Sequence, residues 1–144
     1  MTDSKFYLDT APFIYYLEKS DLYFEKIRRL FMSCYSKNIP LVTSAVTIEE
    51  YCVYPLAHDD KDSVTSFNTF LDGMGIDIIP VDKQIAFEAA KIRSLYAGFK
   101  ALDAIHLATA KISGCSKFIT NDKQLKQIKD IEVLTMDTLS VFYL

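Results

Sequence analysis

The chain is poor in glycine, and this excludes the common phosphate-binding loops. Only 4 of the 144 residues are glycine, and neither the G-x-G-x-x-G pattern nor a P-loop occurs. The G-x-S-x-G turn that presents a nucleophilic serine is missing as well. The run Asp9-Thr10-Ala11 lacks the second aspartate of a D-x-D phosphotransferase. These absences leave metal-assisted hydrolysis as the chemistry to consider.

Cysteine and long apolar runs are also scarce. The three cysteines form no C-x-x-C pair, so we expect buried thiols rather than a disulfide framework or a zinc site; they are Cys34, Cys52 and Cys115. No stretch reaches the roughly 18 apolar residues of a membrane span, and residues 1–5 lack the apolar run of a signal peptide. We therefore expect a soluble, cytoplasmic protein with no membrane contact.

Positive charge is not in surplus, since the net charge is −3. This argues against a nucleic-acid binder that works through a broad basic surface. It leaves open an enzyme that holds phosphates locally through a metal ion. Half of the residues are hydrophobic and 24% are charged, which suits a single domain, over residues 1–144, with a well-buried core.

Short apolar runs alternate with segments of helical periodicity along the chain. The pattern predicts strands over 5–9, 41–43, 76–80, 117–120 and 131–134. It predicts helices after Pro12, over 22–35 with Ser20-Asp21 as the N-cap, over 47–54 with Pro55 as the stop, and over 63–71, 81–98 and 101–112, followed by a tail over 138–144. Such alternation predicts an α/β fold with a parallel sheet covered on both faces.

Four acidic residues lie at strand ends or on apolar stretches, where a functional site is one explanation for them. Asp9 and Asp122 each follow a predicted strand, and ligands of open α/β sheets bind beyond the carboxyl ends of the strands. Glu50 and Asp103 lie on apolar, helix-like stretches. Clustered carboxylates repel one another unless a cation neutralises them. An oxygen-ligand site for Mg²⁺ or Mn²⁺ accounts for all four.

Each acid also has an ordinary explanation. Asp9 is suited to capping a helix, Asp122 to a turn and Asp103 to the start of a helix, while Glu50 is expected to be exposed beside Glu49 if it has no function. Because all four acids occur together, a shared function is favoured over four separate ordinary explanations.

The two histidines have ordinary explanations as well. His106 lies one helical turn after Asp103, and a packed or hydrogen-bonded histidine is favoured there over a metal ligand. His58 lies in a polar stretch and is expected to be exposed.

Four segments resemble the PIN domain family, close to the VapC-type toxins of prokaryotic toxin–antitoxin pairs. They occur in the family's order and spread over nearly the whole chain: residues 7–18 (YLDTAPFIYYLE), 43–50 (TSAVTIEE), 102–110 (LDAIHLATA) and 118–123 (FITNDK). The resemblance implies a three-layer α/β/α sandwich around a central parallel sheet. It also implies a ribonuclease that depends on Mg²⁺ or Mn²⁺.

The resemblance implies particular site residues and partners. The family's acidic quartet falls on Asp9, Glu50, Asp103 and Asp122, with Glu49 as the alternative to Glu50, and its polar helper falls on Thr120 or Asn121. The implied partners are an RNA substrate, a cognate antitoxin and a second copy of the chain. Two other functions stay open: a PIN-like binding or regulatory module, and a Mg²⁺-dependent phosphohydrolase of small substrates.

Two further sets of residues have two readings each. Lys100 and Lys123 lie close in sequence to Asp103 and Asp122, so they either reach a phosphate or are plain surface lysines. Five aromatic residues exceed what a narrow helix stripe needs, and they either line a groove for a partner or belong to the core; they are Tyr23, Phe24, Phe31, Phe67 and Phe70.

Overall fold

Five short strands form one parallel sheet at the centre of the protein. A computed structural model describes residues 4–139. The strands lie in the order β3-β2-β1-β4-β5, with all four pairings parallel. Their bounds are β1 Phe6–Leu8, β2 Leu41–Ser44, β3 Asp77–Ile79, β4 Lys117–Ile119 and β5 Glu132–Leu134. The parallel α/β sheet predicted from the sequence is confirmed.

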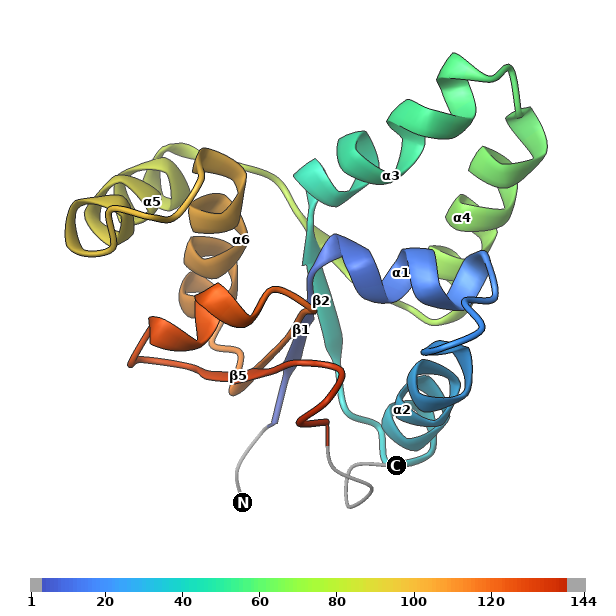
Figure 1. Ribbon diagram of the computed structural model, residues 1–144, viewed down its shortest axis with the longest axis horizontal. Helices are drawn as coiled ribbons and strands as arrows, with labels where there is room; N and C mark the ends of the chain where they lie inside the picture. The colour runs from blue at the N-terminus through green and yellow to red at the C-terminus, as the bar shows by residue number, and fades with distance from the viewer. Residues whose placement is uncertain (1–3, 140–144) are drawn as a thin grey trace.

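Helices cover both faces of this sheet, giving three layers (Figure 1). On one side lie α1 to α4, and on the other lie α5 and α6. Their bounds are α1 Thr10–Leu17, α2 Phe24–Ser36, α3 Ala45–Ala57, α4 Lys61–Gly73, α5 Lys83–Leu95 and α6 Ala101–Ile112, with a short 3-10 helix, η1, over Lys123–Gln127. This is the predicted α/β/α sandwich.

The alternation of side chains along β1 explains why there are two cores. Successive side chains of a strand point to opposite faces. Phe6 and Leu8 therefore pack beneath α1 to α4, whereas Tyr7 packs on the other face with Phe118 of β4 and Leu107 of α6. The Tyr7 and Phe118 rings are stacked, with centroids 4.9 Å apart. All three cysteines are buried and free, as expected.

Most predicted elements are confirmed, with ends shifted by a few residues. The predicted stop at Pro55 is wrong, because α3 continues to Ala57 with the proline inside it. Proline lacks the N–H that bonds to the carbonyl four residues earlier in a helix. Because Pro55 lies in the last turn of α3, the helix ends two residues later and loses only this one hydrogen bond. The predicted cap at Ser20-Asp21 is confirmed only in part. α2 begins at Phe24 and residues 21–23 form a turn, but the Ser20 hydroxyl accepts the N–H of Tyr23 at 3.2 Å and so caps this turn.

Two other sequence predictions concern the ends and the membrane. Residues 140–144 of the predicted tail, like residues 1–3 at the other end, lie outside the described residues. Within residues 4–139, no helix has the length and apolar character to cross a membrane.

Candidate active site

The sheet topology places a crevice at the carboxyl end of β1. This strand is central, with β2 on one side and β4 on the other. Strand order reverses at such a point, and open α/β sheets bind their ligands there. Asp9 follows β1 directly, and its N–H donates to the carbonyl of Ile119 at the end of β4 (2.9 Å). The register thus brings residues 120–122 beside Asp9.

Two threonine-linked contacts orient Asp9. Its Oδ1 accepts the N–H of Thr10 at 2.8 Å, which caps α1, and its Oδ2 accepts the hydroxyl of Thr120 at 2.7 Å. The Thr120 hydroxyl also accepts the N–H of Asp122 at 3.1 Å. Thr120 is fully buried, so it joins the loop after β4 rigidly to the acid after β1.

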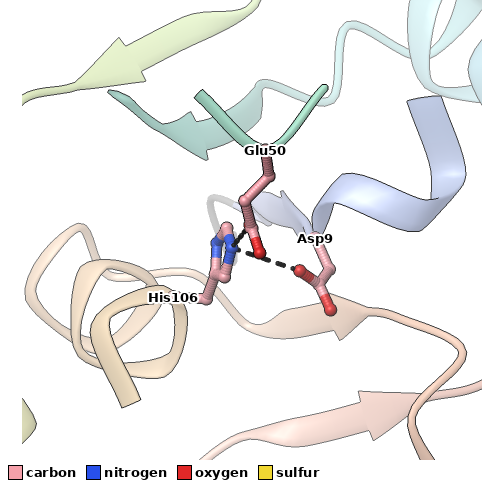
Figure 2. Close-up of side chains that lie close together, drawn as sticks. All are labelled: Asp9, Glu50 and His106. Carbon is pink, nitrogen blue, oxygen red and sulfur yellow. Dashed lines mark hydrogen bonds and ion pairs between the residues drawn. The ribbon is translucent and has the colours of Figure 1, made fainter. Parts of the chain in front are cut away.

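Glu50 reaches the same crevice from α3. Its Oε1 accepts the Thr10 hydroxyl at 2.7 Å and the Nε2 hydrogen of His106 at 2.6 Å. Figure 2 shows Glu50, His106 and Asp9 converging from three separate elements. Glu49 is exposed and takes no part in this group, so Glu50 is the glutamate that the geometry favours.

His106 completes a compact group of three ligand-type side chains. Its Nε2 lies 3.4 Å from Asp9 Oδ1, and the ligand atoms of Asp9, Glu50 and His106 all lie within 4.8 Å of one another. The imidazole is 1% exposed, and Nδ1 lies 2.6 Å from the hydroxyl of Tyr7. The expectation of a buried, hydrogen-bonded histidine is confirmed.

Asp103 and Asp122 do not belong to this group of three. Asp103 is in the first turn of α6, where its carboxylate accepts the N–H of Lys100 (3.3 Å). Asp122 caps η1 by accepting the N–H of Gln124 at 3.0 Å. The charges of Asp122 and Asp9 nevertheless both act on Asp103, which places the three carboxylates in one electrostatic neighbourhood.

Burial and neighbouring charge shift the pKa values in this neighbourhood. The pKa of Asp103 is raised, chiefly because the carboxyl is desolvated and further because Asp122 and Asp9 are negative. Burial acts to raise the pKa of Glu50, but the hydrogen bonds from His106 and Thr10 outweigh it and hold that pKa below its usual value. Burial acts to lower the pKa of His106, but Glu50 and Asp9 raise it overall.

The other polar residues singled out in the sequence have different partners. Asn121 donates its side-chain N–H to the hydroxyl of Tyr15 (2.8 Å), whereas Thr120, the other residue predicted as a helper, donates to Asp9. Lys123 is 69% exposed and pairs with Asp137 at 3.3 Å. His58 is exposed, as expected, and stacks on Tyr54.

The donor set suits a hard divalent cation. Asp9 and Glu50 offer carboxylate oxygens at 16% and 30% side-chain exposure, and Asp103 gains from a nearby positive charge because its pKa is raised. Mg²⁺ and Mn²⁺ favour such oxygen ligands, whereas an imidazole nitrogen suits Mn²⁺ better than Mg²⁺. Sequence reasoning did not identify Thr10 and Tyr7 as part of this site, because neither has a pattern of its own.

Fold and site together define an α/β/α protein with a carboxylate centre at the switch point of its sheet. The chain belongs to the PIN domain family, whose model matches residues 6–131. Members of this family are nucleases and therefore hydrolases. The predicted family is confirmed.

Solved structures of the same fold include toxin–antitoxin complexes and a toxin. DNA-bound VapBC of Salmonella typhimurium has 20% identity and a TM-score of 0.76, over 92% of this chain and 98% of that chain. VapBC2 of Rickettsia felis, bound to a promoter DNA fragment, has 16% identity and a TM-score of 0.71, over 90% and 97%. VapC20 of Mycobacterium tuberculosis, a sarcin–ricin loop cleaving toxin, has 12% identity and a TM-score of 0.69, over 88% and 98%.

These solved structures share the fold of this chain at low sequence identity. None of the curated proteins matches the chain.

Proposed function

We propose that the protein is a Mg²⁺- or Mn²⁺-dependent endoribonuclease and the toxin of a toxin–antitoxin pair. The observation that carries the proposal is the convergence of Asp9 and Glu50 on one crevice, together with the negative charges of Asp122 and Asp9 that act on Asp103. Four acids from four parts of the sequence have no shared structural task there. Metal-assisted phosphodiester hydrolysis explains their proximity.

The chain's own residues would divide the work in a simple way. Asp9, Glu50, Asp103 and Asp122 would hold the cation, while Thr120 and Thr10 fix the orientation of Asp9 and Glu50 through their hydroxyls. A bound divalent cation supplies an activated water and neutralises charge on the phosphoryl oxygens. No serine, cysteine or histidine nucleophile is required, and residues 1–144 would act as one nuclease domain.

Cleavage of RNA with a mapped cut site tests this function. We expect the parent protein to cut total RNA in Mg²⁺ or Mn²⁺ and to stop when the metal is chelated. Asp9→Asn should abolish cleavage while the protein stays folded. The matched control is Asp72→Asn, which changes an exposed residue of α4. This variant should cut RNA as the parent does.

The same assay separates the two alternative functions. Hydrolysis of a small chromogenic phosphate without RNA cleavage would favour a phosphohydrolase. A folded parent that binds the cation and cuts neither substrate would favour a binding or regulatory module. Because Asp9, Glu50, Asp103 and Asp122 are all present, the nuclease is the function we expect.

An antitoxin is the partner that we propose, since the solved neighbours include VapBC complexes. The five aromatic residues were expected either to line a partner surface or to belong to the core. Phe31 and Phe67 are buried in the core, whereas Tyr23, Phe24 and Phe70 are half-buried. An apolar groove remains between α1, α2 and α4, and its lining includes Tyr16, Phe31, Met32, Tyr35, Phe70 and Met74. We propose that an antitoxin segment binds there.

Growth and assembly measurements test the partner proposal. Expression of the chain alone in the cytoplasm should slow growth, and co-expression of the neighbouring gene product should relieve it. We also propose a homodimer, which light scattering after gel filtration would detect. Normal growth with all four acids intact would contradict the toxin role, and a monomer at high concentration would contradict the dimer.

A further inference from the structure

A buried tyrosine–histidine pair lies behind Glu50, and the proposed chemistry makes no direct use of it. Tyr7 of β1 is fully buried and His106 of α6 is 1% exposed. The Tyr7 hydroxyl lies 2.6 Å from His106 Nδ1, and His106 Nε2 lies 2.6 Å from Glu50 Oε1. The three residues thus form a continuous chain from the core to the crevice.

The Tyr7 side chain is held firmly enough to orient the imidazole. Its ring stacks on Phe118 with centroids 4.9 Å apart and planes 8° apart. The imidazole meets the edge of that same ring at 69°, with centroids 5.8 Å apart. A buried polar atom without a partner costs free energy, so the hydroxyl on Nδ1 both satisfies the far nitrogen and sets the plane of the ring.

The near side of the imidazole has a defined hydrogen. A glutamate carboxylate is only an acceptor, so Nε2 carries the hydrogen that lies between it and Oε1. The Thr10 hydroxyl donates to the same oxygen at 2.7 Å. Both donors therefore act on Oε1, and among the described residues no hydrogen bond reaches Oε2.

We propose that Tyr7 and His106 are a positioning pair that turns the Glu50 carboxylate so that Oε2 is presented to a divalent cation. The inference rests on the proposed function, because it assigns a task toward the same cation. A free glutamate side chain has several rotamers, and fixing it costs conformational entropy on binding. The pair supplies this ordering when the protein folds, before any cation is bound.

Hydrogen-bond partners of metal ligands affect affinity in a measurable way. Their loss typically weakens metal binding or activity by about tenfold to a hundredfold. We expect a loss of this size in His106→Leu and a smaller one in Tyr7→Phe, which keeps the ring and removes only the hydroxyl. His106→Gln retains an N–H donor at a similar reach, so it should recover most of the affinity.

The experiment measures Mn²⁺ affinity by calorimetry and RNA cleavage in parallel, on folded protein. The variants are His106→Leu, His106→Gln, Tyr7→Phe and the double variant with Tyr7→Phe and His106→Leu. Because Tyr7 acts through His106, its change should have no further effect on Mn²⁺ affinity once His106 is leucine. The controls are Tyr96→Phe, at a half-buried tyrosine that stacks on Phe99, and the exposed His58→Gln. Both should bind Mn²⁺ as the parent does.

Each outcome decides for or against the pair. Weaker Mn²⁺ binding in the leucine variant, recovery in the glutamine variant and non-additivity with Tyr7→Phe would support it. Parent-like Mn²⁺ affinity in folded Tyr7→Phe and His106→Leu would overturn it, as would a glutamine variant no better than leucine. A parent that binds Mn²⁺ without cutting RNA would contradict only the proposed function, whereas one that binds no Mn²⁺ would overturn both.

Discussion

At the scale of single residues, threonine hydroxyls determine where the carboxylates point. Thr120 donates to Asp9 and Thr10 donates to Glu50. Thr43 is fully buried beside them, where it donates to the Leu8 carbonyl at 2.8 Å and joins β2 to the end of β1. A carboxylate with a fixed donor on one side offers its remaining lone pairs in a defined direction. These hydroxyls therefore help to fix the geometry of the site, although they are not among its four acidic residues.

Removal of the Thr120 hydroxyl tests this preparation. In Thr120→Val, Asp9 Oδ2 loses a donor and the Asp122 N–H loses an acceptor. We expect a stability loss of about 1–3 kcal/mol, the usual cost of leaving such groups unsatisfied, and RNA cleavage at least tenfold slower. Chemical denaturation and cleavage rates measure the two effects. Thr109→Val is the control, since the Thr109 hydroxyl bonds within its own helix. If valine at 120 left cleavage intact, Thr120 would have no role in orienting Asp9.

The raised pKa of Asp103 predicts a pH dependence of stability. Desolvation first, and then the charges of Asp122 and Asp9, favour the protonated carboxyl in the fold. The native state then binds more protons than the unfolded state between the ordinary pKa and the raised one. The contribution of Asp103 thus favours the fold at low pH and is lost as pH rises through the raised pKa.

Asp103→Asn should therefore stabilise the metal-free protein most at neutral pH. The gain over the parent should be clear at about pH 7 and shrink at about pH 3, below the ordinary aspartate pKa. Denaturation curves at the two pH values measure the difference. A gain that is equal at both values, or larger in acid, would contradict the raised pKa.

At the scale of elements, the four candidate acids come from four different segments, three of them from the start of a helix. Asp9 caps α1, Glu50 lies within α3, Asp103 is in the first turn of α6 and Asp122 caps η1. Separate contacts must tie these segments together. Gln124 supplies one, because its backbone N–H bonds Asp122 and its side chain donates to the Gly98 carbonyl, in the loop before α6, at 3.0 Å.

Gly98→Ala should loosen the link between η1 and the loop before α6. A Cβ at this position would lie 2.5 Å from Gln124 Nε2, so the glutamine side chain must move away. Because that side chain is flexible and exposed, we expect a stability change of less than about 1 kcal/mol, but slower RNA cleavage. Adding Gly98→Ala to Gln124→Ala should then slow cleavage no further than Gln124→Ala alone. Additive effects of the two changes would show that Gly98 acts by another route.

At the scale of the whole molecule, the site joins the two helical layers. Glu50 lies on α3 and His106 on α6, and these two helices belong to opposite layers (Figure 1). Their 2.6 Å hydrogen bond crosses the carboxyl edge of the sheet between the two cores. A cation bound at this edge would contact both layers and so oppose their separation on unfolding.

The native state should therefore gain stability from Mg²⁺ or Mn²⁺. A ligand that binds only the folded state contributes about 2.7 kcal/mol at a hundred times its Kd. Thermal melts with increasing metal should show a rising Tm in the parent and a smaller rise in Asp9→Asn, while the Asp72→Asn control follows the parent. A parent Tm that does not change in millimolar metal would count against a functional metal site.

The sequence by itself determined the class of fold and the candidate acids. Strand-like runs that alternate with helical periodicity leave few arrangements other than a covered parallel sheet, and an acid directly after a strand has its edge of the sheet assigned by chain direction alone. The helix over residues 101–112 was predicted at its observed bounds, because its apolar pattern is long and is followed by Gly114. Local chemistry was sufficient for these features.

Only the tertiary structure decided which side chains meet. The hydrogen bonds from Thr10 to Glu50, from His106 to Glu50 and from Thr120 to Asp9 span 40, 56 and 111 residues of sequence, and no local pattern encodes partners so far apart. Glu50 contacts Thr10 and His106 while Glu49 is exposed, because neighbouring residues of a helix face different directions. The contact between Tyr7 and His106 depends on the position of Tyr7 in its strand, since a shift of one residue would send its hydroxyl to the other core.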